Sequence, residues 1–267
     1  MARKTAHLNC ADAAMRLCNP ALASYIPPVT FHFMFMCCGF MAPTPKDYSE
    51  IYKRLQAPIS KVYDCGKKCA PYNNGEPVCC TTGHAIPIVE HSEYKLLKSR
   101  TDMWSPFKPK TAVDRAEVAD LKGSDCRAVE CKGARHCERD NRSMACRTFP
   151  FFPYFSPDGE MVGLATYWSF EGQCWVISNL TIVEQPFIDD MMASHELLFA
   201  ADDDWRRTYR AQSATMRGVY SRKGKRFPVI GRDGKYFWVL PKSGGQMIPA
   251  KKAELMELRS GFPNFAE

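Results

Sequence analysis

Cysteine clustering constrains this chain more than any other feature of its sequence. Eight of its thirteen cysteines fall in two segments, which read Cys65-x3-Cys69-x9-Cys79-Cys80 and Cys126-x4-Cys131-x5-Cys137-x8-Cys146. Thiolates are preferred ligands of zinc and of iron–sulfur clusters. Four of them complete a tetrahedral zinc shell, or hold a [4Fe–4S] cluster with one cysteine on each iron. Because the segments lie far apart in sequence, we expect folding and metal binding to be coupled.

The predicted metal ligands are therefore eight cysteines: Cys65, Cys69, Cys79, Cys80, Cys126, Cys131, Cys137 and Cys146. Their spacing differs from the CxxC…CxxC pattern of a zinc ribbon, so it leaves both an iron–sulfur cluster and zinc open as the cofactor. Two other interpretations also remain open. The thiols are then either buried free cysteines or disulfide partners in an extracellular protein. Cys174, isolated from both segments, is expected to lie outside the site.

The amino-terminal residues do not resemble a signal peptide or a membrane span. The apolar stretch from Ala21 to Met41 is interrupted by Pro27-Pro28 and contains His32, whereas both kinds of segment need a longer uninterrupted apolar run. We expect residues 1–41 to be a leader outside the fold, either disordered or upstream of a true start at Met36 or Met41. The predicted location is the cytoplasm, where thiols stay reduced and clustered cysteines indicate metal or redox chemistry.

The cysteine segments also carry a resemblance to a known family. The Cys65–Cys80 block ends in a Cys-Cys pair, and Cys137, Arg142, Cys146, Arg147, Phe149 and Pro150 fit a later "C…RP..CR.FP" stretch, with Ser143 in place of proline. About a third of the chain thereby resembles the YkgJ-type cysteine-cluster family, described as a zinc- or iron-chelating domain. The long insertion between Cys69 and Cys79 and the extra Cys131 depart from the family pattern. A weaker likeness to the flagellin lysine methylases implies an iron–sulfur cluster.

That weaker likeness supplies the alternative function, a cluster-dependent modifying enzyme such as a protein or RNA methyltransferase. S-adenosylmethionine is a cofactor only under this alternative, and no glycine-rich loop announces a site for it. The sequence also contains no serine–histidine–aspartate triad pattern, phosphate loop or HExxH helix. Whether the protein is an enzyme therefore stays open, and its partner is an unidentified protein or small molecule.

Several other residues have both a functional and an ordinary interpretation. His84 and His136 lie beside cysteines and are either ligands or loop histidines, while His91 and His195 are expected to be structural. Arg147 either offsets thiolate charge or binds an anion, or else it forms a surface ion pair. The aromatic stretch 149–155 is expected both to shield a cluster and to fill the core.

A basic stretch raises the question of nucleic-acid binding. It contains Arg206, Arg207, Arg210, Arg217, Arg222, Lys223, Lys225 and Arg226, in a chain of net charge +7. Basic residues near aromatic residues can follow a phosphate backbone, but a helical run of charge is usually a solvated face, and Asp202 to Asp204 precede it directly. Nucleic-acid binding is therefore the less favoured interpretation, and no membrane association is expected.

The patterns predict an α+β fold in which helices surround an irregular, loop-rich metal-binding centre. Periodicity and turn signals predict helices over 45–56, 92–99, 186–199, 203–220 and 250–258, and extended chain over 161–170 and 174–177. Apolar runs around Gly231-Arg232-Asp233-Gly234 predict a small carboxy-terminal hairpin. The predicted organisation is a cysteine-rich domain over 42–180, with a helical region and the hairpin over 181–267 packed on it.

Overall fold

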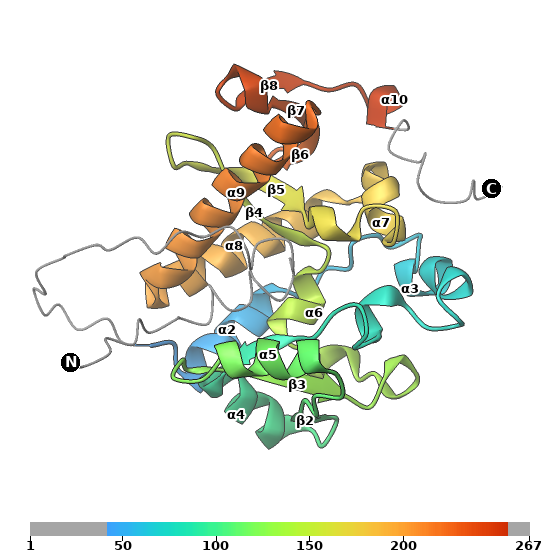
Figure 1. Cartoon of the computed structure of the whole chain (residues 1–267), viewed down its shortest axis with the longest axis vertical. Coiled ribbons are helices and arrows are strands. Elements are labelled where there is room, and N and C mark those ends of the chain that lie inside the picture. The colour runs from blue at the N-terminus through green and yellow to red at the C-terminus, as the bar shows by residue number, and fades with distance from the viewer. Residues whose placement is uncertain (1–41, 256–267) are drawn as a thin grey trace, which may run out of the picture.

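The computed structural model describes residues 42–255, so the predicted leader over 1–41 lies outside the described residues (Figure 1). Its α-helices are α2 (Pro45–Arg54), α3 (Cys65–Cys69), α4 (His91–Arg100), α5 (Ala112–Asp120), α6 (Met144–Thr148), α7 (Trp175–Ser178), α8 (Gln185–Ala201), α9 (Asp203–Lys223) and α10 (Lys252–Leu255). Its strands are β1 (Ile88–Glu90), β2 (Trp104–Pro106), β3 (Cys126–Cys131), β4 (Phe151–Phe155), β5 (Met161–Thr166), β6 (Phe227–Gly231), β7 (Tyr236–Leu240) and β8 (Gln246–Pro249).

The predicted α+β class is confirmed, and the carboxy-terminal hairpin is part of a larger sheet. β6 and β7 pair antiparallel around the predicted turn, where Gly231 donates its N–H to Lys235 O over 2.7 Å and Gly234 takes a φ of 72°. The sheet has the order β4-β5-β6-β7-β8. Because β5 pairs with β6, strands from both sides of residue 180 share one sheet. The domain boundary predicted at residue 180 therefore does not lie between two separate sheets.

The two longest helices pack on the five-stranded sheet. α8 and α9 both contact β4, and α9 runs diagonally across the view in Figure 1. Between α9 and the sheet lie Met216 and Tyr220 of the helix with Tyr154 of β4 and Phe227 of β6, all at most 3% exposed. This largely aromatic layer packs α9 onto the sheet.

A second layer at the other end of the molecule contains the three-stranded sheet. Its order is β1-β3-β2, and both pairings are antiparallel. Ile88, Phe107, Leu121 and Ala128 form a small core between this sheet and the end of α5. α2 packs against both α4 and α8, and so joins this layer to the rest of the fold.

Local sequence signals account for the helix ends. α2 begins with a capping box, in which Thr44 and Asp47 each accept a hydrogen bond from the other's backbone N–H. α9 begins after the N-cap Asp202 and ends at Gly224, whose φ of 65° suits glycine. The helices predicted over 45–56, 92–99, 186–199 and 203–220 are confirmed to within a few residues, and the described part of the last one is α10.

The prediction of extended chain was wrong at two places, the first of which is Trp168–Phe170, a 3₁₀ helix that follows β5. Residues 174–177 were expected to be extended, but α7 covers Trp175–Ser178. All four residues of this helix are buried, and a short apolar run does not distinguish a buried strand from a buried helix. No helix within residues 42–255 is long and apolar enough to cross a lipid bilayer.

The contact between β5 and β6 generates a stability prediction. A Cβ added at Gly163 would overlap Ile230 O and lie 2.9 Å from Gly231 Cα, and backbone atoms in a sheet cannot move aside cheaply. We expect Gly163→Ala to lower the free energy of unfolding by about 1–3 kcal/mol in urea denaturation.

Gly218→Ala in α9 is the matched control, because its added methyl group would meet only Arg222 Nη1, at 3.6 Å. It should raise the free energy of unfolding by about 0.5–1 kcal/mol, the usual gain from replacing a helical glycine. Equal effects of the two substitutions would contradict the close β5–β6 contact.

Candidate metal centre

The first two cysteines lie on one short helix. α3 begins after Asp64, whose Oδ1 accepts hydrogen bonds from two backbone N–H groups of the first turn, at 3.0 and 3.2 Å. A separation of four residues places Cys65 and Cys69 on the same helix face. Cys69 Sγ accepts a hydrogen bond from the N–H of Val78 over 3.5 Å. This bond ties α3 to the segment that carries the cysteine doublet.

The doublet lies on a 3₁₀ turn, Val78–Cys80, held by a polar loop. Asn73 Nδ2 donates to Thr81 Oγ1 over 3.0 Å, and Asn73 Oδ1 pairs with His84 Nε2 over 3.1 Å. His84 is exposed and belongs to this loop network. Neither His84 nor His136 lines the cavity described below, so the loop interpretation of both histidines is favoured.

Strand β3 carries Cys126 at one end and Cys131 at the other. Residues five apart in a strand point to opposite faces, and the two lie about 17 Å apart along the strand at about 3.3 Å per residue. Cys131 pairs with Trp104 and faces the cavity, whereas Cys126 pairs with Glu90 and packs with the small core of the three-stranded sheet. Cys126 is also disulfide-bonded, while every other described cysteine is free. It is the predicted ligand that the structure does not bring to the others.

The last two predicted ligands follow in irregular chain. Cys137 comes directly after the 3₁₀ turn Ala134–His136, and Cys146 lies in α6. Ser143 caps α6 by accepting a hydrogen bond from Cys146 N–H over 3.3 Å. The start of this helix is thereby fixed beside the thiol.

The residues at the start of β2 gather the segments around Cys131 and Cys137. Met103 O accepts from Lys132 N–H over 3.2 Å, and Met103 Sδ accepts from Glu138 N–H over 3.3 Å. Trp104 Nε1 donates to Asn141 O over 2.7 Å. These two buried residues, through the backbone carbonyl of Met103 and both side chains, thus hold together the residues that follow Cys131 and Cys137.

One cavity of about 670 Å³ brings the thiols together. It is lined by seven of the predicted ligands, Cys65, Cys69, Cys79, Cys80, Cys131, Cys137 and Cys146, and by Cys174. Phe149 also lines it, while Phe151, Phe152, Tyr154 and Phe155 are buried in the core. The core role expected of the stretch is therefore seen at these four residues, whereas Phe149 lies at the cavity.

The thiols sit in surroundings that oppose ionisation. Burial raises the pKa of Cys146 and of Cys174 to about 12, and it raises the pKa of Cys65, Cys131 and Cys137 as well. Desolvation disfavours the charged thiolate, and neighbouring thiolates add repulsion. Without a bound cation these cysteines remain neutral thiols at physiological pH.

The pKa values of the two thiols in the doublet are shifted in opposite directions. A hydrogen bond with Cys80 raises the pKa of Cys79, and the same bond lowers the pKa of Cys80, because the Cys79 thiol donates to the Cys80 sulfur. Arg142 also acts on the cavity, since its positive charge lowers the pKa of Cys80, Cys137 and Cys146 against the effect of burial. Cys80 is therefore the thiol best prepared to become a thiolate.

The donor set fits a thiolate-bound metal in chemistry, but it does not form a closed single-ion site. Within residues 42–255, no three His, Cys, Asp or Glu side chains converge closely enough to hold one metal ion. The thiols instead surround a space. Zinc in a structural site needs four donors within about 2.3 Å of one point, whereas each cysteine of an iron–sulfur cluster binds its own iron and the sulfurs stand farther apart.

Cys174 is a site residue that the sequence did not reveal. It was expected to lie outside the site because no other cysteine is near it in sequence, yet it is 6% exposed and lines the cavity. The Sγ atom of Cys69 lies 3.9 Å from the carbonyl oxygen of Gln173, and α3 packs against α7. Long-range packing of this kind places Cys174 with the others.

Arg147 lines the cavity beside Cys146 and does not form the surface ion pair that was the alternative role. It is 7% exposed, and its guanidinium donates to the carbonyl oxygens of Arg142, Leu55 and Asp140 over 2.9, 2.9 and 2.6 Å. The same group lies 4.6 Å from the ring centroid of Tyr52. Arg147 therefore holds the Cys146 segment to the end of α2 instead of forming a surface ion pair.

Two acids are buried in this part of the fold, and one of them, Glu93, lines the cavity. Glu93 Oε1 accepts from Tyr52 OH over 2.6 Å and from Met144 N–H over 2.7 Å. Glu90 Oε2 accepts from Tyr48 OH over 2.8 Å, and its Oε1 accepts from Trp205 Nε1 over 2.6 Å. Burial raises the pKa of each acid to about 7 despite these donors. Neither acid was singled out in the sequence, where Glu93 is an ordinary glutamate in the predicted helix over 92–99 and Glu90 precedes that helix.

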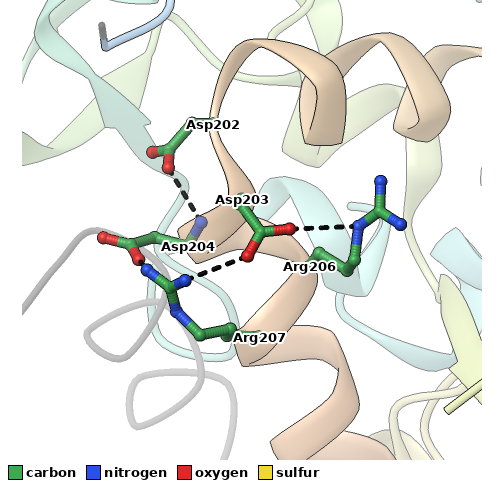
Figure 2. A network of polar contacts seen from close by, with 5 residues as sticks. All are labelled: Asp202, Asp203, Asp204, Arg206 and Arg207. Atoms are coloured by element: carbon green, nitrogen blue, oxygen red, sulfur yellow. Dashed lines mark hydrogen bonds and ion pairs between the residues drawn. The ribbon is translucent and has the colours of Figure 1, made fainter. Parts of the chain in front are cut away.

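The basic stretch is partly neutralised at the start of α9. Asp203 accepts from Arg206 Nε over 3.3 Å and from Arg207 Nη1 over 2.9 Å, and Asp204 pairs with Arg207 Nη2 (Figure 2). Asp202 Oδ1 accepts from Asp204 N–H over 2.8 Å and caps the helix. The acidic residues that precede the stretch are thus the partners of its first two cations.

Two later cations of the same stretch contact the body of the protein. Arg217 Nη1 donates to Tyr154 OH over 3.1 Å and to Phe155 O over 2.7 Å. Arg226 stacks over Trp238 with its guanidinium carbon 4.0 Å from the ring centroid, and it lies 3.8 Å from Glu254. Several cations of the stretch, among them also Lys223 over the ring of Tyr220, therefore have contacts within the protein, and nucleic-acid binding stays the less favoured prediction.

No known family model matches this chain, and no curated protein or solved structure shows significant similarity to it. The residues and contacts described above are therefore the basis for assigning a function.

The raised pKa of Glu93 generates a prediction about pH. The folded-state pKa of about 7 lies above the ordinary value of 4.5, so the folded protein keeps a proton that the unfolded chain loses. The free energy of unfolding should therefore fall as pH rises between about 4.5 and 7, by up to about 1.4 kcal/mol per pH unit for this group. Glu93→Gln should flatten the dependence in that window, as measured by urea denaturation from pH 5 to pH 8.

Exposed Glu160 supplies the control, and Glu160→Gln should leave the pH dependence as in the parent protein. Glu90 contributes in the same direction, so a residual slope is expected in the Glu93→Gln variant. An unchanged slope in that variant would show that Glu93 titrates normally.

The three carbonyl contacts of Arg147 generate a second prediction. An ammonium group cannot reproduce the planar fork that reaches all three acceptors. Arg147→Lys should lower the free energy of unfolding by about 2–3 kcal/mol, because hydrogen bonds to charged donors are lost. Exposed Arg135→Lys, two residues before Cys137, is the control and should change stability by less than about 0.5 kcal/mol. Equal stability of the two variants would contradict the proposed role of Arg147.

Proposed function

We propose that this chain is a metal-binding protein whose cavity thiolates hold an iron–sulfur cluster of the [4Fe–4S] kind, with zinc as the alternative metal. The observation that carries the proposal is the cavity itself. Free thiols from α3, the cysteine doublet, β3, the following loop, α6 and the residue before α7 all line one space of about 670 Å³. Thiolates are the ligands that select zinc and iron–sulfur clusters.

The energetics of the cavity support the same proposal. Buried thiols with raised pKa values contribute little hydrogen bonding, and buried thiolates repel one another. A bound cation reverses this balance, because coordinated thiols are deprotonated and their negative charge is offset by the metal. Metal binding should therefore release protons and stabilise the fold together.

The arrangement of the donors favours a cluster over a single zinc ion. The described thiols surround a space and do not converge on one point. A cluster spans such a space because each of its irons takes one cysteine. The cysteine spacing that resembles the YkgJ-type family is compatible with either metal.

The free thiols also support a cytoplasmic location as part of this proposal. Eight of the nine described cysteines are free, even though several line the same cavity. A reducing compartment keeps thiols available for metal.

A second candidate function, a cluster-dependent modifying enzyme such as a protein or RNA methyltransferase, is favoured by the size of the cavity. A volume of about 670 Å³ falls within the usual range for small-molecule sites. Glu93, Trp104 and Arg142 line it beside the thiols and offer an acid, an aromatic face and a cation. Saturable binding of S-adenosylmethionine in equilibrium dialysis would favour this function over metal binding alone.

The two cysteines of β3 give a matched test of the metal site. Anaerobically purified protein is expected to contain iron and acid-labile sulfide, or zinc under the alternative. Cys131→Ser should lower the metal content and the midpoint of thermal unfolding together, because metal binding and folding are linked. Cys126→Ser, on the opposite face of the same strand, should retain the metal.

The readouts are elemental analysis, sulfide analysis and thermal unfolding followed by circular dichroism. Parent protein without metal after anaerobic purification and reconstitution would exclude the proposed function. Loss of metal in Cys126→Ser but not in Cys131→Ser would place the site elsewhere.

A further inference from the structure

We propose that one end of the molecule, formed by the carboxyl end of α9, the strands β6 to β8 and the start of α10, is a docking surface for an acidic segment of a partner protein. The inference goes beyond the proposed metal site, because none of the cations that carry it lines the thiol cavity. It starts from the distribution of charge along the described chain.

Positive charge is concentrated in the part of the chain that forms this end. Residues 205–252 contain thirteen lysines and arginines and a single acid, Asp233, whereas residues 42–204 contain nineteen basic and twenty-four acidic residues. The strands β6, β7 and β8, the carboxyl end of α9 and α10 lie at the top of Figure 1. The fold therefore gathers the excess of positive charge at one end, and residues 42–204 are acid-rich.

Six cations form the surface that we call the basic end. All six are exposed: Lys223, Lys225, Arg226, Lys242, Lys251 and Lys252. Lys242 belongs to the 3₁₀ turn after β7 and reaches the end of α9, since its Nζ would lie 3.7 Å from a Cβ added at Gly224. Arg226 Nη2 lies 3.8 Å from Glu254 Oε2, which places the start of α10 beside the start of β6. Three separate segments thus form one surface.

Contacts within the chain account for only part of this charge. Lys223 lies over the ring of Tyr220, and Arg226 lies over the ring of Trp238. Four lysines form no ion pair within residues 42–255: Lys225, Lys242, Lys251 and Lys252. Their ammonium groups are open to carboxylates from outside the chain.

Helix ends do not explain the whole cluster either. A positive charge at the carboxyl end of a helix stabilises it. This effect accounts for Lys223 in the last turn of α9, and in part for Lys225 and Lys242 beside that turn. Lys251 and Lys252 instead stand at the start of α10, where a cation opposes the helix dipole.

The acids beside the basic end already have partners. Glu254 Oε2 accepts from Trp238 Nε1 over 2.6 Å, and Glu171 accepts from Tyr220 OH. They leave the lysines without a matching number of carboxylates. A surface of one sign attracts a partner of the opposite sign and orients its approach.

The chemistry of the basic end fits carboxylates better than a nucleic acid. Tyr220 and Trp238 are each 3% exposed and lie beneath cations, so they offer no face on which a base could stack. Five of the six cations are lysines, which bind as point charges, whereas arginine forms the bidentate contacts typical of phosphate recognition. A nucleic acid that extended beyond this end would also meet the acid-rich part of the chain, which would repel it.

The test measures binding of a fluorescein-labelled oligoglutamate peptide to the full-length protein by fluorescence anisotropy. Parent protein should bind it more tightly at about 0.01 M salt than at about 0.15 M, because the Debye length falls from about 30 to about 8 Å. Lys225→Gln/Lys251→Gln/Lys252→Gln should weaken binding about tenfold, since three surface charge pairs are lost.

The matched control is Lys95→Gln/Lys108→Gln/Lys122→Gln, which removes the same charge from exposed positions in the acid-rich part of the chain. It should change the affinity less than about twofold. Equal loss in the two triple variants would overturn the basic end as the docking surface, and so would parent protein that does not bind the peptide at the lower salt concentration. Circular dichroism checks that both variants fold.

Single-stranded RNA and duplex DNA with the same number of charges as the peptide are measured in parallel. We expect each to bind more weakly than the peptide. If either bound more tightly, and lost affinity in the basic-end variant but not in the control, a nucleic acid would be the occupant and the acidic protein segment would be wrong.

Discussion

The strongest constraint on this structure is the confinement of eight thiols around one cavity of low polarity. Each thiol alone is an acceptable buried group, since a neutral cysteine behaves as a small apolar side chain. Ionised together they would repel one another strongly, and burial already raises the pKa of Cys146 and Cys174 to about 12. The cavity therefore has two consistent states, one with neutral thiols and one with thiolates balanced by metal. The proposed function follows from the second state.

The cavity is lined largely by irregular chain, which is held in place by hydrogen bonds to buried residues and not by long helices or strands. Arg147 satisfies three backbone carbonyls, and Met103 and Trp104 satisfy backbone groups beside the cysteines. Glu93 accepts a hydrogen bond from the N–H of Met144, the first residue of α6. Buried polar backbone groups need such partners, because irregular chain in the interior lacks the regular backbone hydrogen bonds of a helix or a sheet. This arrangement leaves the thiol side chains free to face the cavity while their backbone is held.

The support for these walls comes from the shared core. The five-stranded sheet takes strands from both halves of the chain, and α8 and α9 cover it. α2 packs against α8 and delivers Tyr48 and Tyr52 to the buried acids. The cysteine-rich segments therefore pack on an aromatic core. The basic residues at the start of α9 form ion pairs with Asp203 and Asp204 of the same helix. The thiol cavity is the feature that this core positions.

The sequence by itself determined the α+β class, the long helices, the hairpin and seven of the thiols that share the cavity, because periodicity, capping residues, turn residues and cysteine spacing are local signals. It could not determine the other members of the site. Cys126 and Cys131 look equivalent in sequence, and only the pairing of β3 shows that they face opposite sides. Cys174 has no neighbouring cysteine, and the packing of α7 on α3 brings it in. Leu55, which accepts from Arg147, and Tyr52, which donates to Glu93, lie tens of residues away from them. Tertiary structure decided these points, because strand register and long-range contacts depend on the whole fold and not on any short segment.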